Sequence, residues 1–246
     1  MSELPTPEPP VALVVGASSA IGRAIGAHLH ADGYDVVGAS LEEMTDPAYK
    51  HCIVADCSTP PGARAAVEAA TRLTGRLDVV IPAAAIMPVA RAEDTTDEQW
   101  RTGLGATLDS AFFVLREAMP HLRDGSAVVA ISSVNATLAA PGVPAYAAAK
   151  AGLEGLVRQL ALDYGPRGIR VNAVAPGMIG PSDLPDVTEG YPLRRIGTPD
   201  DVAAAVSYLA SPAAGFVTGV VLPVDGGLSI SSPAAWLRPD LRRRFL

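Results

Sequence analysis

Residues 11–33 constrain the fold of this chain more than any other stretch. The first five of them are apolar, which is typical of a strand buried on both faces of a parallel sheet. The run GASSAIG that follows turns the chain into a helix, and Ile21, Ile25 and Leu29 mark the buried face of that helix. Backbone N–H groups and the positive end of a helix converge at such a turn. The segment therefore predicts a cradle for a pyrophosphate group.

Strand-like and helix-like segments continue to alternate along the chain. Apolar runs predict strands at residues 34–39, 52–55, 77–81, 127–132, 169–174 and 220–224, and periodic apolar positions predict helices at 64–73, 97–121 and 145–164. A further helix is expected to start at Thr198, a hydroxyl cap followed by proline and two acids. This alternation predicts an α/β fold, a Rossmann-type doubly wound parallel sheet with helices on both faces. We expect one such domain at 11–246, after a disordered leader at 1–10.

Composition argues against several classes of partner. The formal net charge is −7, which argues against nucleic acid or an anionic membrane as the main partner. No run is long enough to span a bilayer, and residues 1–10 lack the basic and apolar regions of a signal peptide. Cys52 and Cys57 have no set of Cys or His around them at metal spacing, so we expect reduced thiols, no metal site and a cytoplasmic protein.

Three residues that can move a proton are expected to converge after the strand at 127–132. Tyr146 and Lys150 are four residues apart, so on the helix at 145–164 they share one face. Ser133 lies just past the strand, where open α/β sheets expose their chemistry. The serine could hold a carbonyl and the phenol could act as acid or base, with its pKa lowered by the ammonium. Taken alone, the spacing Y-x-x-x-K is more typical of a solvated lysine beside a half-buried tyrosine.

Further runs make the sequence similar to a known family. The stretches IRVNAVAPG at 169–177, RRIGTPDDVA at 194–203 and VDGG at 224–227 accompany the Gly-rich turn and the Ser, Tyr and Lys set. With them, the chain resembles the single-domain short-chain dehydrogenases/reductases over roughly residues 11–228, and it is similar to the 3-oxoacyl-carrier-protein reductases among them. The resemblance implies a nicotinamide dinucleotide cofactor and a parallel sheet of about seven strands with three helices on each side.

The resemblance also implies roles for individual residues. Ser133 would polarise a carbonyl, Tyr146 would give or take its proton, and Lys150 would bind the nicotinamide ribose and lower the pKa of the tyrosine. Thr107 stands where the family has a catalytic asparagine that holds a water linked to the lysine. The residues implied to bind the cofactor are Gly16, Ser18, Ser19, Ile21, Gly22, Ser40, Asp56 at the adenine, Cys57, Ala84, Tyr146, Lys150, Pro176, Gly177 and Ile179 at the nicotinamide carboxamide.

Three positions depart from the family pattern. Ala20 replaces a glycine of the turn and adds a methyl group near the phosphate, and the run PAAA at 82–85 replaces Asn-Asn-Ala-Gly. Thr107 has only a hydroxyl, and we expect part of its hydrogen-bonding capacity to go to a backbone carbonyl one turn back. Gly103 and Gly105 weaken the same helix, so a local opening of its backbone is expected there.

The leading hypothesis is an oxidoreductase that transfers a hydride between a nicotinamide dinucleotide and a ketone or secondary alcohol. The main alternative is a relative that binds the cofactor without turnover and acts as a sensor or scaffold. The intact set of Ser133, Tyr146 and Lys150 favours the enzyme. An epimerase or dehydratase on a nucleotide sugar is a weaker third hypothesis, because longer relatives of that kind carry an extra substrate domain.

The end of the second strand gives NADP(H) a modest preference over NAD(H). NAD-selective relatives place an acid there, which repels a 2′-phosphate, and this chain has Ser40 followed by Leu41. Glu42 and Glu43 are close in sequence, and Arg23 is the nearest cation.

Residues 177–194 resemble the family's mobile substrate cover. Its apolar side chains are those of Met178, Ile179, Leu184, Val187 and Tyr191, and no Lys or Arg occurs before Arg194. We therefore expect a neutral, mainly apolar small molecule as the carbonyl or alcohol substrate. The helices at 97–121 and 145–164 are the usual subunit interface of the family. A low share of charged residues, 18%, also favours a buried interface, so a homotetramer or homodimer is expected.

Overall fold

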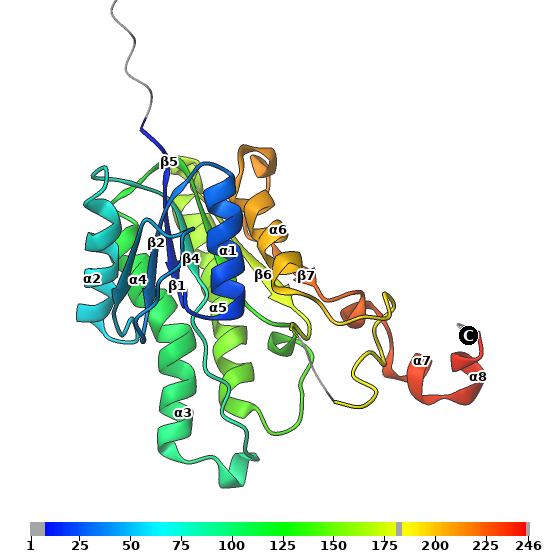
Figure 1. Ribbon diagram of the computed structural model, residues 1–246. Coiled ribbons are helices and arrows are strands. Elements are labelled where there is room, and N and C mark those ends of the chain that lie inside the picture. Colours follow the sequence, from blue (N-terminus) through cyan, green and yellow to red (C-terminus); the bar gives the residue numbers. More distant parts are fainter. Residues whose placement is uncertain (1–7, 181–183, 245–246) are drawn as a thin grey trace, which may run out of the picture.

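The computed structural model describes residues 8–180 and 184–244. Its strands form one parallel sheet in the order β3-β2-β1-β4-β5-β6-β7 (Figure 1). Their bounds are Val11–Val15 for β1, Asp35–Ser40 for β2, His51–Val54 for β3, Leu77–Pro82 for β4, Leu122–Ile131 for β5, Arg170–Pro176 for β6 and Val221–Val224 for β7. The order reverses between β1 and β4, which is the point where doubly wound sheets bind ligands. The predicted fold class is confirmed.

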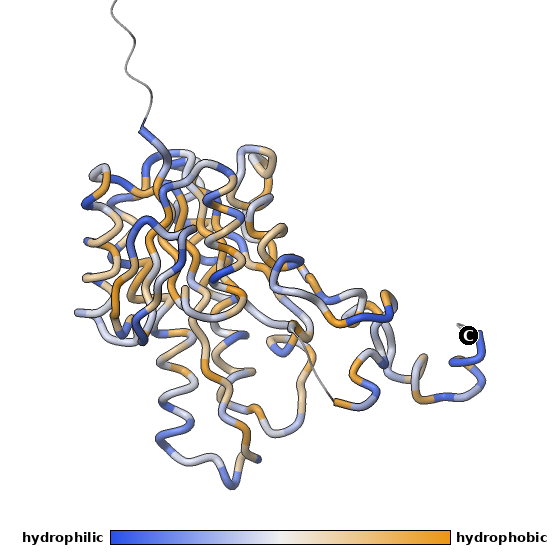
Figure 2. Tube along the Cα trace, in the orientation of Figure 1, coloured by the Kyte–Doolittle hydropathy of each residue, from blue (hydrophilic) through white to orange (hydrophobic). Residues whose placement is uncertain are grey.

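Helices pack on both faces of the sheet and enclose two apolar cores (Figures 1 and 2). On one face lie α1, Ala20–Ala31, and α6, Pro199–Ala210; on the other lie α2, Pro60–Thr71, α4, Ser110–Ala118, and α5, Pro144–Tyr164. The short helix α3, Asp97–Leu104, packs on α5 beyond the strand ends, and α7, Pro233–Leu237, and α8, Pro239–Arg242, form a C-terminal arm. Successive residues of β1 belong to opposite cores because side chains alternate along a strand.

The expectation of three helices on each face is wrong for the face that carries α1 and α6. The connection from β2 to β3, residues 41–50, forms no helix, and its length is only the minimum of about 10–12 residues that a crossover containing a helix needs. The buried ring of Tyr49 fills the place instead. Gly26 and Gly38 make room for it, since a Cβ would lie 2.2 Å from the ring at the first and 2.8 Å at the second.

The long helix predicted at 97–121 is interrupted by a π-helical turn, Gly105–Asp109, between α3 and α4. The wide turn falls where glycines were expected to let the backbone open, so that prediction is confirmed. Single π-turns inside helices are frequent at functional sites. Another difference is the start of α2, which begins at Pro60 rather than at residue 64 because the Thr59 hydroxyl accepts a hydrogen bond from the N–H of Gly62.

Residues from the runs at 169–177 and 194–203 hold β6, α6 and β7 together. Arg170 donates hydrogen bonds to carbonyls at the C-terminal end of α6, and the side-chain amide of Asn172 bonds the backbone at residues 217 and 220, just before β7. Thr198 and Asp201 form the capping box that starts α6. These contacts fix the strand that ends at Pro176. Within the described ranges, no helix is long and apolar enough to cross a membrane.

Candidate active site

A pocket of about 450 Å³ lies at the carboxyl ends of the central strands. The sequence-predicted residues that line it are Gly16, Ser18, Ser19, Ile21, Ser40, Asp56, Cys57, Ala84, Ser133, Tyr146, Lys150, Pro176, Gly177 and Ile179. Gly22 and Thr107 do not line it. Sequence reasoning missed Ser58, Ala106 and Ser110, which also line the pocket, and named Glu42 only as a residue near Ser40. Glu42 and Ser58 lie in the loops that follow β2 and β3, so their position past a strand end is the signal that could have identified them.

The Gly-rich turn between β1 and α1 is shaped to admit a phosphate. Gly16 has a φ of +86°, and a Cβ there would lie 2.7 Å from the backbone N of Ala84. The Ser19 hydroxyl caps α1 by accepting a 3.0 Å hydrogen bond from the N–H of Gly22. Gly22 therefore stabilises the turn through its backbone N–H and does not line the pocket. Ala20 is exposed and does not line the pocket, so the expected crowding by its methyl group is absent, and the turn fits a pyrophosphate.

The ends of β2 and β3 form the other end of the pocket. The Ser40 hydroxyl donates a 2.6 Å hydrogen bond to the carbonyl of Glu42, and the Asp56 carboxylate accepts hydrogen bonds of 3.0 and 2.6 Å from the N–H and hydroxyl of Ser58. Burial, and to a smaller extent the charge of Asp56, raises the pKa of the Cys57 thiol to about 12. Cys57 is thus a packed, unreactive thiol, and both it and Cys52 are free, as expected.

Lys150 is the most deeply buried charged residue of the pocket. Its Nζ donates a 2.6 Å hydrogen bond to the carbonyl of Ile131 at the end of β5, and it lies 5.5 Å from the centroid of the Tyr146 ring. Only 1% of the residue is exposed. Burial lowers the pKa of Lys150 to about 7, so its charge changes near neutral pH.

Tyr146 and Ser133 meet across the gap between α5 and β5. Burial raises the pKa of the Tyr146 phenol above its ordinary value, and a hydrogen bond with the Ser133 side chain acts in the opposite direction. The net lowering of the Tyr146 pKa that was expected from Lys150 is therefore not found in the described geometry, because the effect of burial is the larger one.

A second pair on the same helix face was not anticipated. The Ser132 hydroxyl donates a 2.8 Å hydrogen bond to the Glu154 carboxylate, and both residues are buried. Glu154 lies one turn beyond Lys150, just as Lys150 lies one turn beyond Tyr146. The three side chains from α5 thus engage three successive residues at the end of β5, 131–133. The four-residue spacing of Tyr146, Lys150 and Glu154 was the available signal.

Thr107 lies in the π-helical turn and is 1% exposed. Its Oγ1 has no hydrogen-bond partner among the described residues, so the expected bond to a carbonyl one turn back is not made. Ser110 makes such a bond instead, donating to the carbonyl of Ala106 at 2.7 Å. An orphaned buried hydroxyl has an unmet capacity for one hydrogen bond, which a water or ligand atom could satisfy.

The expected substrate cover includes residues 181–183, which lie outside the described residues. Of its named apolar side chains only that of Ile179 lines the pocket. Ile179 pairs with Gly197, where any Cβ would lie 2.4 Å from the Ile179 side chain. Tyr191 is buried, and its hydroxyl accepts a 2.9 Å hydrogen bond from the N–H of Met178. Tyr191 therefore anchors the segment at its base.

Comparison with known proteins places this arrangement in a family. The family model described as Enoyl-(Acyl carrier protein) reductase matches residues 16–229. A versicolorin reductase of Emericella nidulans is 34% identical over 88% of this chain and 94% of its own. An L-rhamnose 1-dehydrogenase (NAD(P)(+)) of Azotobacter vinelandii is 34% identical over 89% of this chain and 96% of its own.

A solved structure shows the same fold. The ligand-free aldohexose dehydrogenase of Thermoplasma acidophilum matches with a TM-score of 0.86 and 32% identity, over 92% of this chain and 96% of that one. The family model and these relatives each cover most of the sequence. The chain therefore belongs to the short-chain dehydrogenase/reductase family and is an NAD(P)-dependent oxidoreductase that acts on CH–OH groups.

Proposed function

We propose that the protein interconverts a ketone and a secondary alcohol, with Tyr146 as the group that gives or takes the proton. The observation that carries the proposal is the fit of one face of α5 against the end of β5. Lys150 is held on the carbonyl of Ile131, and Tyr146 is hydrogen-bonded to Ser133. All three reactive side chains line the same pocket as the phosphate-binding turn.

A bound nicotinamide dinucleotide supplies or accepts a hydride at the substrate carbon. Side chains of the protein bind the substrate oxygen and transfer the proton to or from it. The Ser133 oxygen accepts a 3.2 Å hydrogen bond from the N–H of Asn135, and its O–H, which meets the Tyr146 phenol, can rotate to donate to a carbonyl oxygen of the substrate. The Tyr146 phenol, adjacent to Ser133, then transfers its proton to the same oxygen as negative charge develops there. Lys150, with a pKa of about 7, can lose and regain a proton at neutral pH and so restore the phenol.

The protonation state of Tyr146 supports carbonyl reduction as the direction at neutral pH. Burial raises its pKa, so the phenol is protonated and ready to act as an acid. Alcohol oxidation needs the phenolate, which the same burial disfavours. The oxidative rate should therefore increase with pH more steeply than the reductive rate when both are measured with saturating cofactor.

The charge of the pocket supports a neutral, mainly apolar substrate. Of the described residues that line it, Lys150 is the only cation, and it is bonded to the Ile131 carbonyl. Ala85 and Ile86 follow β4 and line the pocket, and both carboxylates, on Glu42 and Asp56, follow β2 and β3. A carboxylate on the substrate would lack a free basic partner among these side chains. Small dicarboxylates should therefore be poor substrates.

The choice between the two dinucleotides depends on the end of β2. Ser40 in place of an acid removes one source of repulsion, and this is the basis for expecting NADP(H). Two observations count against NADP(H). Glu42, an acid, lines the pocket, and the guanidinium of Arg23, the nearest cation, is 3.1 Å from the Asp46 carboxylate and so already paired. The residues around Ser40 therefore decide which of the two dinucleotides binds.

Exposed apolar side chains on α4 and α5 support a homotetramer or homodimer. Phe112 on α4 is 44% exposed and Leu162 on α5 is 76% exposed. Single exposed apolar residues are ordinary, but these two lie on the helices that short-chain dehydrogenases/reductases commonly use between subunits. Light scattering coupled to size exclusion tests the assembly, and Phe112→Asp should shift it toward smaller species. The two free cysteines support a reducing, cytoplasmic setting.

A turnover screen tests the function. Purified protein is assayed with NADH and NADPH against aliphatic ketones, aromatic ketones, 3-oxoacyl thioesters, aldoses and small dicarboxylates, with Tyr146→Phe as the blank. We expect turnover of at least one uncharged ketone that the Phe variant does not support. Binding of cofactor without turnover anywhere in the panel would favour the sensor or scaffold alternative.

A further inference from the structure

The helix-free connection between β2 and β3 places fixed charges at one end of the pocket. We propose that this connection makes the protein select NAD(H) over NADP(H), by holding the Arg23 guanidinium on Asp46 and by presenting the Glu42 carboxylate to the ribose end of the cofactor. The inference rests on the proposed dinucleotide site and names the residues that decide which dinucleotide fills it.

The end of the pocket formed by β2 and β3 is electronegative. Ser40, Leu41 and Glu42 line it from β2, and Asp56 and Ser58 line it from β3. Among the described lining residues, the charged side chains at this end are the two carboxylates. A 2′-phosphate carries a charge of about −1.5 to −2 at neutral pH and would add to them. A free 2′-hydroxyl can instead donate a hydrogen bond to a carboxylate.

Arg23 is the cation nearest to this end, and it is already engaged. Its Nε donates a 3.3 Å hydrogen bond to the carbonyl of Ser18, a residue that lines the pocket, so the guanidinium lies beside the pocket edge. Its terminal nitrogen lies 3.1 Å from the Asp46 carboxylate. A phosphate would have to compete with this carboxylate for the guanidinium. Arg23 is thus close to the pocket but neutralised.

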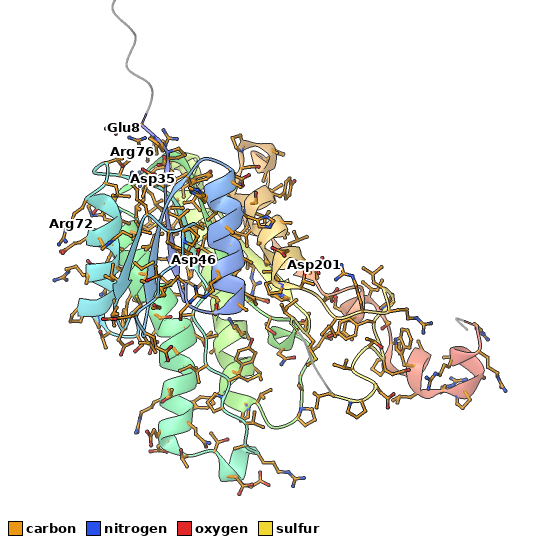
Figure 3. The ribbon with its side chains drawn as sticks, viewed as in Figure 1. Glu8, Asp35, Asp46, Arg72, Arg76 and Asp201 are labelled. Carbon is orange, nitrogen blue, oxygen red and sulfur yellow. The ribbon has the colours of Figure 1, made fainter. Side chains whose placement is uncertain are left out.

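Asp46 is held in place by its own segment. The Asp46 carboxylate also accepts a 3.1 Å hydrogen bond from the N–H of Ala48, and its carbonyl accepts one of 3.0 Å from the N–H of Tyr49. The Tyr49 ring is buried between Gly26 and Gly38, and its hydroxyl donates to the carbonyl of Gly22. Figure 3 shows Asp46 beside α1. The buried tyrosine therefore fixes the carboxylate that holds Arg23.

The balance of charge follows from these contacts. A 2′-phosphate at this end would lie near Glu42, which lines the pocket, and near a guanidinium that Asp46 neutralises. The rim is partly exposed, so salt screens these interactions but does not remove them at contact distance. We expect the phosphorylated cofactor to bind at least about tenfold more weakly than NAD(H), a difference of about 1.4 kcal/mol.

Binding of fragments tests the inference without turnover. Isothermal titration calorimetry compares ADP-ribose with 2′-phospho-ADP-ribose, which differ only in the phosphate and cannot exchange a hydride. Weaker binding of the phosphorylated fragment by tenfold or more supports the inference. Equal or tighter binding overturns it and leaves the proposed oxidoreductase intact. If neither fragment binds, the dinucleotide site and the inference both fail.

Variants test the mechanism of selection. Asp46→Asn keeps the acceptor for the N–H of Ala48 but frees Arg23, so the affinity for 2′-phospho-ADP-ribose should rise about tenfold while that for ADP-ribose changes little. The gain should disappear in the double variant Asp46→Asn/Arg23→Ala. Glu42→Gln should give a smaller gain. Glu43→Gln is the matched control, because it makes the same change of charge at a neighbour that does not line the pocket.

Two results would refute the role assigned to Arg23 and Asp46. One is an unchanged affinity for the phosphorylated fragment in Asp46→Asn, with melting temperature and ADP-ribose affinity showing that the variant is folded. The other is a gain that persists without Arg23, since the guanidinium would then not be the group released. A gain in Glu43→Gln as large as that in Glu42→Gln would reduce the effect to net charge and overturn the assignment of Glu42.

Discussion

The ring of Tyr49 occupies the space that a side chain at Gly26 would need. A Cβ on Gly26 would lie 2.2 Å from Cε2 of the ring, and the Tyr49 hydroxyl lies 2.6 Å from the carbonyl of Gly22 one turn earlier in α1. A residue from a ten-residue connection thereby sets the position of the helix that begins at the phosphate-binding turn. The packing of the β2–β3 connection and the geometry of the cofactor site are therefore linked.

The first prediction concerns the space beside Gly26 and Gly38 that the Tyr49 ring fills, here called the tyrosine slot. Gly26→Ala should lower the free energy of unfolding by about 1–3 kcal/mol, because the new methyl group meets a ring that is itself buried and cannot move aside. Gly155→Ala is the control: this helical position on α5 is exposed and has nothing within 4 Å of an added Cβ, so a gain of about 0.5–1 kcal/mol is expected. Urea unfolding measures both. Loss of stability in both variants would show that the cost at Gly26 does not come from the contact with Tyr49.

The second prediction concerns the proton donor. Tyr146→Phe should reduce kcat by roughly 10²–10⁴-fold, because positioned proton transfer contributes that much. The dissociation constant for NADH should change less than about threefold, a difference of well under 1 kcal/mol. Lys150→Ala should lower kcat and raise the dissociation constant for NADH. Steady-state kinetics and nicotinamide fluorescence give the two readings. A Phe variant with more than a tenth of the normal rate would remove Tyr146 from the role of acid.

The third prediction uses the pKa of Lys150, which burial lowers from 10.5 to about 7. Above pH 7 the unfolded chain keeps a proton on this lysine that the folded chain has lost, so the lysine makes stability rise with pH. Between pH 7 and 9 the slope should approach about 1.4 kcal/mol per pH unit. Lys150→Met should abolish this contribution. The difference between the two proteins in urea unfolding across the window isolates it.

Above pH 9 a second buried group opposes this rise. Burial raises the pKa of the Cys57 thiol from 9.0 to about 12, so the unfolded chain loses that proton first. This loss offsets the contribution of Lys150 until the unfolded lysine titrates near 10.5, above which stability falls. A wild-type slope no different from that of Lys150→Met between pH 7 and 9 would mean that Lys150 keeps its proton when buried.

The fourth prediction concerns Thr107, whose buried hydroxyl has no hydrogen-bond partner among the described residues. Thr107→Val should reduce kcat less than about tenfold, below the roughly 10²–10⁴-fold of a positioned proton transfer, because the π-helical turn leaves backbone groups to hold a water. Thr107→Asn should be tolerated or mildly activating. A thousandfold loss in the Val variant would assign the relay to the hydroxyl itself. Activity that appears only with Asn would favour the sensor alternative.

The fold could be predicted from local pattern. Apolar runs separated by helices leave few arrangements for a chain of this length, and GASSAIG after the first run identifies the switch point of the sheet. The convergence of Ser133, Tyr146 and Lys150 follows from one strand end and a four-residue spacing. These features depend on residues close together in sequence.

The features that were missed depend on distant residues. The Tyr49 slot needs glycines from both α1 and β2, and neither glycine has a pattern that identifies its partner. The raised pKa of Tyr146 depends on burial, which a chain without coordinates does not give. Tyr191 looked like one more apolar residue of a cover, and its role as an anchor depends on where the N–H of Met178 lies.

The packing of Tyr49 against Gly26 and Gly38 also limits which β2–β3 connections can be recombined between this protein and its relatives. A β2–β3 connection that contains a helix would remove Tyr49 and leave Gly26 and Gly38 facing an unfilled space, and Tyr49 placed into a scaffold with larger residues at those positions would clash. Recombination within the family should therefore preserve the three positions as a unit. Among homologues, tyrosine at position 49 should occur together with glycine at 26 and 38, and chains that have lost one should have lost all three.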